Sequence, residues 1–421
     1  MNIKTLAIAA AAVMTAGAAQ AADLGHPVKA AVDYVKVCDA YGAGFFYIPG
    51  SDTCLQISGY ARASYLAGSS NSWLTNTNSP LKFASSPRSA SSWTTATEIE
   101  LDFDARTNTD FGLLRSYISI EADFNGGGQL GTNSTGFNMN RGFVQWGGLT
   151  AGNTETFFTH YTGDADGLAF GEMAPDYHTN VLAYTFAFGN GVTATLSVED
   201  STLGNRVSAP TASNFTYGGN HTPDVVAQLA ITQAWGSAQL SAGLHQAYSN
   251  NAALVNNISK EGWGVLGYVG FNLPMIGAGD KIDIQASYSE GALDWVNSQW
   301  GPQVGTGGIV GDATVLTSGG SKLTSAWGVG VGFQHNFSST VFVQLEGGAA
   351  GVTGYTVDGL KGSSFNQYDA AMSLGWTPVK NLTITGDLEY RAVDFTSTTK
   401  AEWTVKDADA WIVGLRVKRS F

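Results

Sequence analysis

The chain has 421 residues, of which 43% are hydrophobic and only 13% are charged, about half the charged share of ordinary soluble domains. Beyond the N-terminal region no stretch of about 18 consecutive apolar residues occurs, which excludes a membrane-spanning helix there. Acidic residues outnumber basic ones by 34 to 21, which argues against nucleic-acid binding because that function needs basic patches. No Pro/Ser-rich tract or charge run divides the chain, so one large closed sheet explains its length better than several domains.

The first 21 residues show the three parts of a secretory signal peptide. Residues 1–4 form a short basic start, residues 6–16 an alanine-rich apolar run, and residues 19–21 (AQA) a small-residue cleavage pattern. A membrane anchor is the alternative, but the apolar run is too short for one. We therefore expect the mature chain to begin near Ala22. Loss of Lys4 leaves 20 basic and 34 acidic residues, a net charge of −14.

Two cysteines, Cys38 and Cys54, follow the signal peptide. In the oxidising compartment of a secreted protein, a disulfide is the expected state of such a pair. Two free thiols or a catalytic cysteine are the alternatives, and no nearby histidine supports catalysis. We expect the bridge to lie upstream of the first strand and outside the lumen of the sheet. It would contribute roughly 3 kcal/mol to stability, and we expect its role to be structural only.

From residue 55 onward the dominant signal is an alternation of apolar and polar residues with period two, which predicts β-strands. The segment 95–106 is the most informative example, because its apolar residues alternate with Glu98, Glu100, Asp102, Asp104 and Arg106. In a soluble sandwich the apolar face would need a cover. In a transmembrane barrel the apolar face lies in lipid and the charged face in a water-filled lumen, which suits this pattern better.

Fourteen segments show the alternation clearly, and two less certain strands near Phe143 and Leu149 raise the count to 16. An even number is what a single-chain bacterial barrel requires. The fourteen segments are 55–65, 95–106, 114–124, 182–188, 192–198, 225–231, 238–244, 263–273, 282–288, 327–333, 341–345, 368–376, 382–392 and 411–421.

The connections between these strands alternate in length. Short turns are predicted at 108–110, 147–148, 189–191, 234–236, 336–338 and 377–378. Long polar stretches lie at 125–138, 200–223, 249–260, 290–322 and 349–366. Short turns on one side and long loops on the other are typical of a transmembrane barrel. The predicted fold is therefore all-β, a 16-stranded antiparallel transmembrane β-barrel.

The final strand, 411–421, has an aromatic residue at each end. Ten residues at about 3.3 Å each, tilted by about 40°, span roughly 25 Å, the height of a barrel's lipid-facing band. Trp411 and Phe421 would then lie at opposite interfaces, where aromatic girdles belong. A terminal phenylalanine on such a strand also resembles the signal read by barrel-assembly machinery, so we assign Phe421 that role.

The residues 37–50 (VCDAYGAGFFYIPG), followed by 53–55 (TCL) and 59–60 (GY), closely resemble the start of the alphaproteobacterial porin family, as in Brucella and rhizobial porins. Further matches are 147–149 (GGL) with Gly152, and the C-terminal strand. The resemblance implies a 16-stranded barrel, a homotrimer, and a third external loop folded into the pore. It implies an integral outer-membrane protein in contact with lipid and lipopolysaccharide. The domains would be a signal peptide (1–21), a periplasmic segment (22–53) and the barrel (54–421).

The third external loop, at about 154–179, contains five acids and no Lys or Arg. Folded inward, it would place carboxylates at the narrowest point, and rings of acidic side chains favour cations. The alternative is that these acids only solvate an outward loop. The predicted constriction residues are Glu155, Asp164, Asp166, Glu172 and Asp176. Strand parity places an opposing basic wall at Arg62, Arg106, Arg115, Arg391 and Arg416.

Metal and cofactor motifs are weak. The run 164–167 (DADG) lacks the EF-hand spacing, although a looser Ca²⁺ site with Glu172 stays an alternative. His160 and His178 lie in the same loop without a zinc-binding pattern. The glycines of 328–332 alternate within a strand and no helix follows, so a dinucleotide site fails. We expect no cofactor.

The function that the sequence favours is passive diffusion of small hydrophilic solutes and ions through a weakly cation-selective porin, which is not an enzyme. The first alternative is an outer-membrane barrel adhesin or enzyme, which would need a Ser/His/acid constellation or a large exposed domain. The second is a soluble secreted β-protein such as a lectin, which would need no detergent.

Overall fold

The structure is a computed structural model in which the chain divides into two units, Met1–Val37 and Cys38–Phe421. The predicted signal peptide and the first part of the segment 22–53 lie outside the described residues. The residues that the structure describes are 36–68, 93–126, 134–161, 163, 174–201, 207–208, 216–217, 221–250, 258–298, 300, 310–315, 321–354, 364–403 and 406–421.

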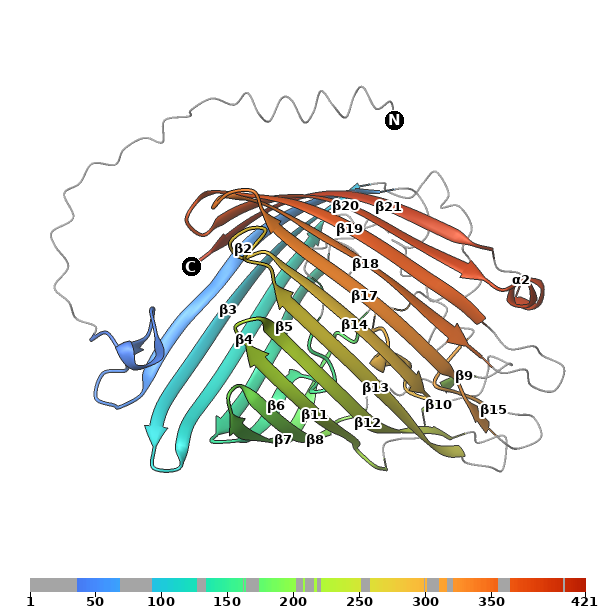
Figure 1. Cartoon of the computed structure of the whole chain (residues 1–421), viewed down its shortest axis with the longest axis horizontal. Coiled ribbons are helices and arrows are strands. Elements are labelled where there is room, and N and C mark those ends of the chain that lie inside the picture. Colours follow the sequence, from blue (N-terminus) through green and yellow to red (C-terminus); the bar gives the residue numbers. More distant parts are fainter. Residues whose placement is uncertain are drawn as a thin grey trace, which may run out of the picture. The chain divides into compact units, whose positions relative to one another are not determined.

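The second unit is a closed antiparallel β-barrel whose strands follow one another in sequence order (Figure 1). The first barrel strand, β2 (Cys54–Gly68), pairs with β3 (Trp93–Thr109) on one side and with the last strand, β21 (Ala408–Ser420), on the other. This last pairing closes the sheet, which confirms the predicted 16-stranded barrel within the described residues. The strands between are β4 (Gly112–Gly126), β5 (Ser134–Trp146), β6 (Leu149–Glu155), β7 (His178–Gly189), β8 (Val192–Glu199), β11 (Asp224–Gln233), β12 (Gly236–Asn250), β13 (Ile258–Asn272), β14 (Lys281–Glu290), β17 (Ser325–Asn336), β18 (Val341–Thr353), β19 (Ser364–Val379) and β20 (Leu382–Phe395).

Several short elements accompany the barrel. β1 (Phe46–Tyr47) and β10 (Thr216–Tyr217) add to its edges, and three short strands form a separate small sheet. No helix in the described part of the chain is long and apolar enough to cross a bilayer. The small sheet consists of β9 (Val207–Ser208), β15 (Ala313–Val315) and β16 (Ser321–Leu323), and the helices are η1 (Asp39–Tyr41), η3 (Leu293–Trp295) and α2 (Ser397–Trp403).

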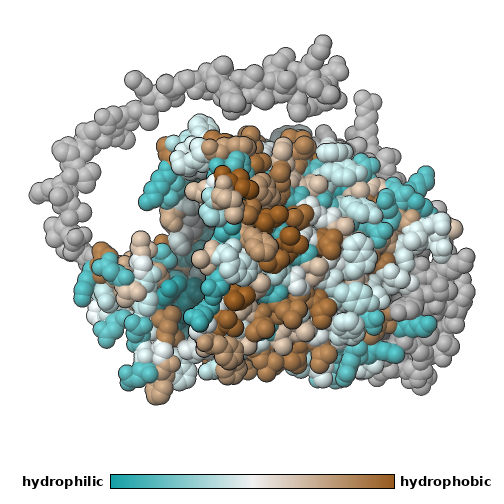
Figure 2. All heavy atoms as spheres, in the orientation of Figure 1, coloured by the Kyte–Doolittle hydropathy of each residue, from teal (hydrophilic) through white to brown (hydrophobic). Residues whose placement is uncertain are grey.

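The two faces of each barrel strand differ as the alternation predicts. On β12, the outward Leu240 and Leu244 are 60% and 59% exposed, whereas the inward Gln239, Ser241 and His245 are buried. Figure 2 shows hydrophobic residues gathered in a band across the outer surface, with hydrophilic residues toward both ends of the strands. An apolar outer face around a polar inner face is the arrangement that a lipid bilayer requires.

Short turns and long loops lie at opposite ends of the barrel, which we call the turn end and the loop end. The turn between β7 and β8 shows why particular residue types are needed in the short turns. Asn190 and Gly191 have φ angles of 50° and 72°, in the left-handed region. A Cβ at Gly191 would lie 2.0 Å from the carbonyl oxygen of Thr232, so only glycine fits there.

The N-terminal segment is bound to the turn end of β2. β1 pairs with Leu55 and Cys54, beside the point where β21 stops pairing with β2 at Tyr60. The backbone N–H of Phe421 donates to the carbonyl of Gly59, at 3.0 Å. Thus β1 covers the edge of β2 that the last strand leaves open.

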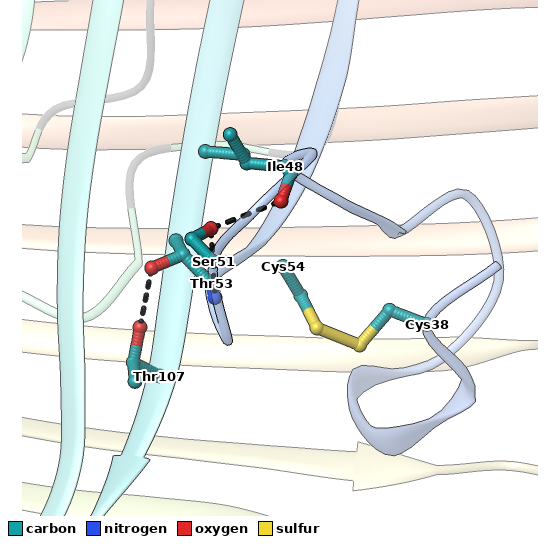
Figure 3. The surroundings of a disulfide bond; sticks show 6 residues. All are labelled: Cys38, Ile48, Ser51, Thr53, Cys54 and Thr107. Atoms are coloured by element: carbon teal, nitrogen blue, oxygen red, sulfur yellow. Dashed lines mark hydrogen bonds between the residues drawn. A yellow bond between two sulfur atoms is a disulfide. The ribbon is translucent and has the colours of Figure 1, made fainter. Parts of the chain in front are cut away.

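The predicted disulfide is present between Cys38 and Cys54, with a Cα–Cα distance of 6.0 Å (Figure 3). The prediction that it lies upstream of the first strand and outside the lumen is wrong. Cys54 is the first residue of β2, its strand partner is Arg106, and both cysteines are buried. The alternation of β2 extends one residue before Leu55, which turns the Cys54 side chain to the inner face.

Candidate pore-lining site

The loop between β6 and β7, residues 156–177, is the third connection at the loop end, and we call it loop 3. β6 has only 7 residues, so loop 3 leaves the wall well before the rim. Its first part lies against the inner face of β11 and β12. The side-chain amide of Gln228 donates to the carbonyl of Phe157 at 2.8 Å, and that of Gln239 donates to the carbonyl of Thr159 at 3.0 Å. The described start of loop 3, 156–161, is therefore inside the barrel.

A buried carboxylate fixes the point where the chain turns inward. The hydroxyl of Thr156 donates to one oxygen of Glu199 at 2.6 Å, and the backbone N–H of Phe157 donates to the other at 3.0 Å. Glu199 ends β8, on the inner face. One buried carboxyl group that accepts two hydrogen bonds is a strong anchor, so this contact directs loop 3 away from the wall.

The five acids predicted for the constriction are only partly described. Glu155 ends β6, and its carboxylate lies 3.9 Å from the Arg141 guanidinium. Asp176 is exposed near the end of loop 3. Asp164, Asp166 and Glu172 lie outside the described residues, so an acidic constriction and a Ca²⁺ site with Glu172 remain predictions. Among the residues that the structure describes, no group of three or more His, Cys, Asp or Glu could hold a metal ion.

The predicted basic wall is largely paired with carboxylates of the same wall. Arg62 lies 2.5 Å from Glu98, while Arg106 and Arg115 share Asp104 at 2.7 and 2.9 Å. Local pairing cancels much of the positive field that isolated arginines would project into a lumen.

The other two predicted wall residues, Arg391 and Arg416, are buried at 4% and 5% exposure. Arg391 lies 3.3 Å from the buried carboxylate of Asp369, and Arg416 donates to the hydroxyl of Ser64 at 3.3 Å. Strand parity predicts an inward direction for both side chains. It could not predict their burial, which depends on what packs against them.

A row of acids on β3 and β4 belongs to the same inner face. Glu100 is the direct cross-strand partner of Glu121, and Glu98 is the partner of Asp123. Like charges in direct opposition destabilise a sheet unless water or cations screen them. The alternation in 95–106 placed the β3 acids on the polar face, but we did not count them as pore residues. The inner-face acids of the two strands are Glu98, Glu100, Asp102, Asp104, Glu121 and Asp123.

The turn end of this wall carries aromatic side chains against the arginines. The Arg106 guanidinium lies 4.9 Å from the ring centre of Phe45, which precedes β1. Arg115 lies 5.0 Å from the ring of Tyr117 and 5.3 Å from that of Phe143. Such contacts restrict the guanidinium groups. The disulfide-linked segment 38–45 is therefore part of the inner surface at the turn end.

Comparison with known proteins gives a consistent result. A family model described as "Porin subfamily" matches residues 26–414. Porin Omp2b of Brucella suis is 28% identical over 391 residues, covering 80% of this chain and all of the relative. Porin Omp2b of Brucella neotomae is 34% identical over 247 residues, covering 56% of this chain and 64% of the relative. The outer-membrane channel DcaP of Acinetobacter baumannii superposes with a TM-score of 0.65 at 15% identity, over 89% of this chain and 99% of that one, which shows a shared fold.

Proposed function

Because the chain belongs to the porin subfamily and is an integral outer-membrane channel protein, we propose that small hydrophilic solutes and ions diffuse passively through it, with a weak preference for cations. The observation that carries the cation preference is the row of six carboxylates on the inner faces of β3 and β4. Three arginines of the same wall are bound to two of these acids, Glu98 and Asp104. The inner faces of β2 to β4 carry six carboxylates and three arginines, and a net negative surface attracts cations and repels anions.

The test is the zero-current potential of single channels in a KCl gradient across a planar bilayer. We expect Glu100→Gln combined with Glu121→Gln to move the potential toward anions, because the variant removes two opposed carboxylates from the inner face. The effect should shrink at high salt, since the Debye length falls from about 10 Å at 0.1 M to about 3 Å at 1 M. Asp110→Asn, in an exposed turn at the turn end, is the matched control and should move the potential less. An unchanged potential in the double variant at low salt would rule out this wall as the source of selectivity.

We also propose that the protein is a homotrimer in contact with lipid and lipopolysaccharide. The support is the resemblance of residues 37–60 to alphaproteobacterial porins, together with an outer face apolar enough for lipid or a neighbouring barrel. Mass measurement of the detergent-solubilised, unheated protein should give three chains per particle. A single chain per particle under mild extraction contradicts the trimer without affecting the channel.

A further inference from the structure

Described residues of a second loop also lie against the inner face of the barrel. Residues 291–324, between β14 and β17, form the sixth connection at the loop end, which we call loop 6. It begins with the single turn η3, and its Leu293 and Val296 are fully buried. These loop residues share one hydrophobic cluster with inward residues of β17, β18, β19, β20 and β21. The cluster comprises Leu293, Val296, Trp300, Val310, Ala326, Ala350, Val352, Phe365, Val393 and Phe395, with Ala408 against it.

Loop 6 is internally braced. The backbone N–H of Leu293 donates to the carboxylate of Asp312 at 2.7 Å, and the indole N–H of Trp300 donates to the carbonyl of Leu293 at 2.9 Å. Gly291 and Thr324, at the two ends of the loop, share a backbone hydrogen bond of 2.8 Å. These bonds hold the described residues of loop 6 together, so that they can serve as a fixed support.

Trp295 of loop 6 contacts the start of loop 3. Its indole stacks on the ring of Phe158, with centroids 4.7 Å apart and planes at 11°. Two inward glycines make room for it. A Cβ would lie 2.4 Å from the indole at Gly243 and 2.8 Å from it at Gly264. The glycines of β12 and β13 thus form a flat surface on which the indole lies.

Loop 6 also holds the returning end of loop 3. The indole N–H of Trp295 donates to the hydroxyl of Tyr177 at 2.7 Å. The backbone N–H of Ser298 donates to the carbonyl of Ala174, and the N–H of Asp176 donates to the hydroxyl of Ser298, both at 3.1 Å. Trp295 therefore touches loop 3 both where it enters the lumen and where it leaves.

We propose that loop 6 sets the position of loop 3 in the lumen and that Trp295 is the positioning residue for the solute path. The inference rests on the proposed channel function. Loop 3 has 22 residues between β6 and β7, enough to adopt several courses unless other parts of the barrel fix it. The wall residues Gln228, Gln239 and Glu199 fix its start, and loop 6 joins that start to its return. Without Trp295 the two arms of loop 3 separate and the loop samples more positions.

The test compares Trp295→Ala with Trp263→Ala in single-channel recordings. Trp263 lies on β13 next to Gly264 but is partly exposed on the outer face, so its variant removes the same indole from the lipid side. We expect open-channel current noise at least about double that of the wild type in Trp295→Ala, because loop 3 loses local stability, together with a shifted zero-current potential. Trp295→Phe, which keeps the stack and loses the N–H, should lie between. Trp263→Ala should match the wild type in both measurements.

A second variant distinguishes a folding defect from a loss of loop 3 positioning. Ser298→Ala removes one hydroxyl and is the test variant if Trp295→Ala fails to assemble. The open-channel current noise of Ser298→Ala should also rise above that of Trp263→Ala. The positioning role alone is overturned if the wild type conducts and the folded Trp295 and Ser298 variants show unaltered current noise and zero-current potential. A wild-type protein that does not conduct overturns the proposed function itself. A rise in Trp263→Ala equal to that in Trp295→Ala also overturns the positioning role.

Discussion

At the scale of single residues, the arginines of the inner wall are paired with carboxylates over short distances. Asp104 accepts hydrogen bonds from Arg106 and Arg115, and each guanidinium also lies against aromatic rings. Charge-assisted pairs of this geometry are stronger than ordinary hydrogen bonds and hold the side chains against the wall. A passing ion therefore meets fixed charges of both signs.

Asp280, in the connection between β13 and β14 at the turn end, provides a prediction about pH. Its carboxylate is buried and accepts hydrogen bonds from His335 and from the backbone of Asn336. The contact with His335 lowers the pKa of Asp280 below its ordinary value of 3.8. The folded state therefore favours the charged form. The resulting stabilisation is complete above the unfolded value and is lost as the pH falls through the lower folded value.

We expect Asp280→Asn to reduce the thermal stability of the barrel at neutral pH and to remove part of its acid dependence below about pH 4. Heat modifiability on gels at a series of pH values measures both. Asp110→Asn, an exposed turn acid at the same end, should follow the wild type. Parallel pH curves for wild type and Asp280→Asn would contradict the assignment.

At the scale of elements, the disulfide-linked segment 38–45 gives a prediction that differs from the sequence-based one. Loss of the bridge in Cys38→Ser should cost about 3 kcal/mol of stability. Because Cys54 lies on the inner face beside Arg106, we expect the freed segment also to change single-channel conductance. Ser51→Ala, in the turn between β1 and β2, is the control. Wild-type conductance in folded Cys38→Ser would show that the segment does not narrow the turn end.

Loop 3 carries the prediction about its own acids. If the middle of the loop lines the constriction, neutralising Asp164, Asp166 and Glu172 together should move the zero-current potential toward anions at low salt. Neutralising an equal number of acids on another external loop should move it less. An unchanged potential in the triple variant means that loop 3 does not form the narrowest point.

The sequence predicts the strands far better than it predicts the loops. A strand between lipid and water has one environment on each face, so the alternation in 95–106 reports directly which way each side chain points. Loop 6 has no such period, and the burial of Leu293 and Trp295 arises from contacts with remote strands. For the same reason parity placed Arg391 inward, but the pairing with Asp369 could not be read from the sequence.

At the scale of the whole molecule, outward aromatic residues recur at the turn end of successive strands. Phe421 is one member of this set, 56% exposed on the outer face. The others are Phe111, Trp146, Phe188, Trp235, Phe271, Phe337 and Trp376, all exposed. A ring of aromatic side chains at one interface fixes the depth of a barrel in its membrane.

Deletion of Phe421 should reduce the amount of protein in the outer membrane and increase its degradation in the periplasm. The deletion shortens the lipid-facing face of β21 and removes the predicted assembly signal. Membrane fractionation measures the outcome. Phe337→Ala is the control, because it removes an equivalent aromatic side chain at the turn end from within the chain. Equal outer-membrane levels for wild type and the Phe421 deletion would remove the assembly role.

The pairing of Tyr60 with Ser420 means that the ring of strands has no intrinsic beginning. The chain could be joined across this seam and reopened in another short turn, giving a circular permutant with the same barrel. Opening it after Phe337 would make β17 the last strand, again ending in an outward aromatic residue. The order in which the strands leave the ribosome would then change, while every strand would keep its neighbours. The permutant would therefore separate the sequence features that determine the barrel fold from those that direct its assembly into the outer membrane.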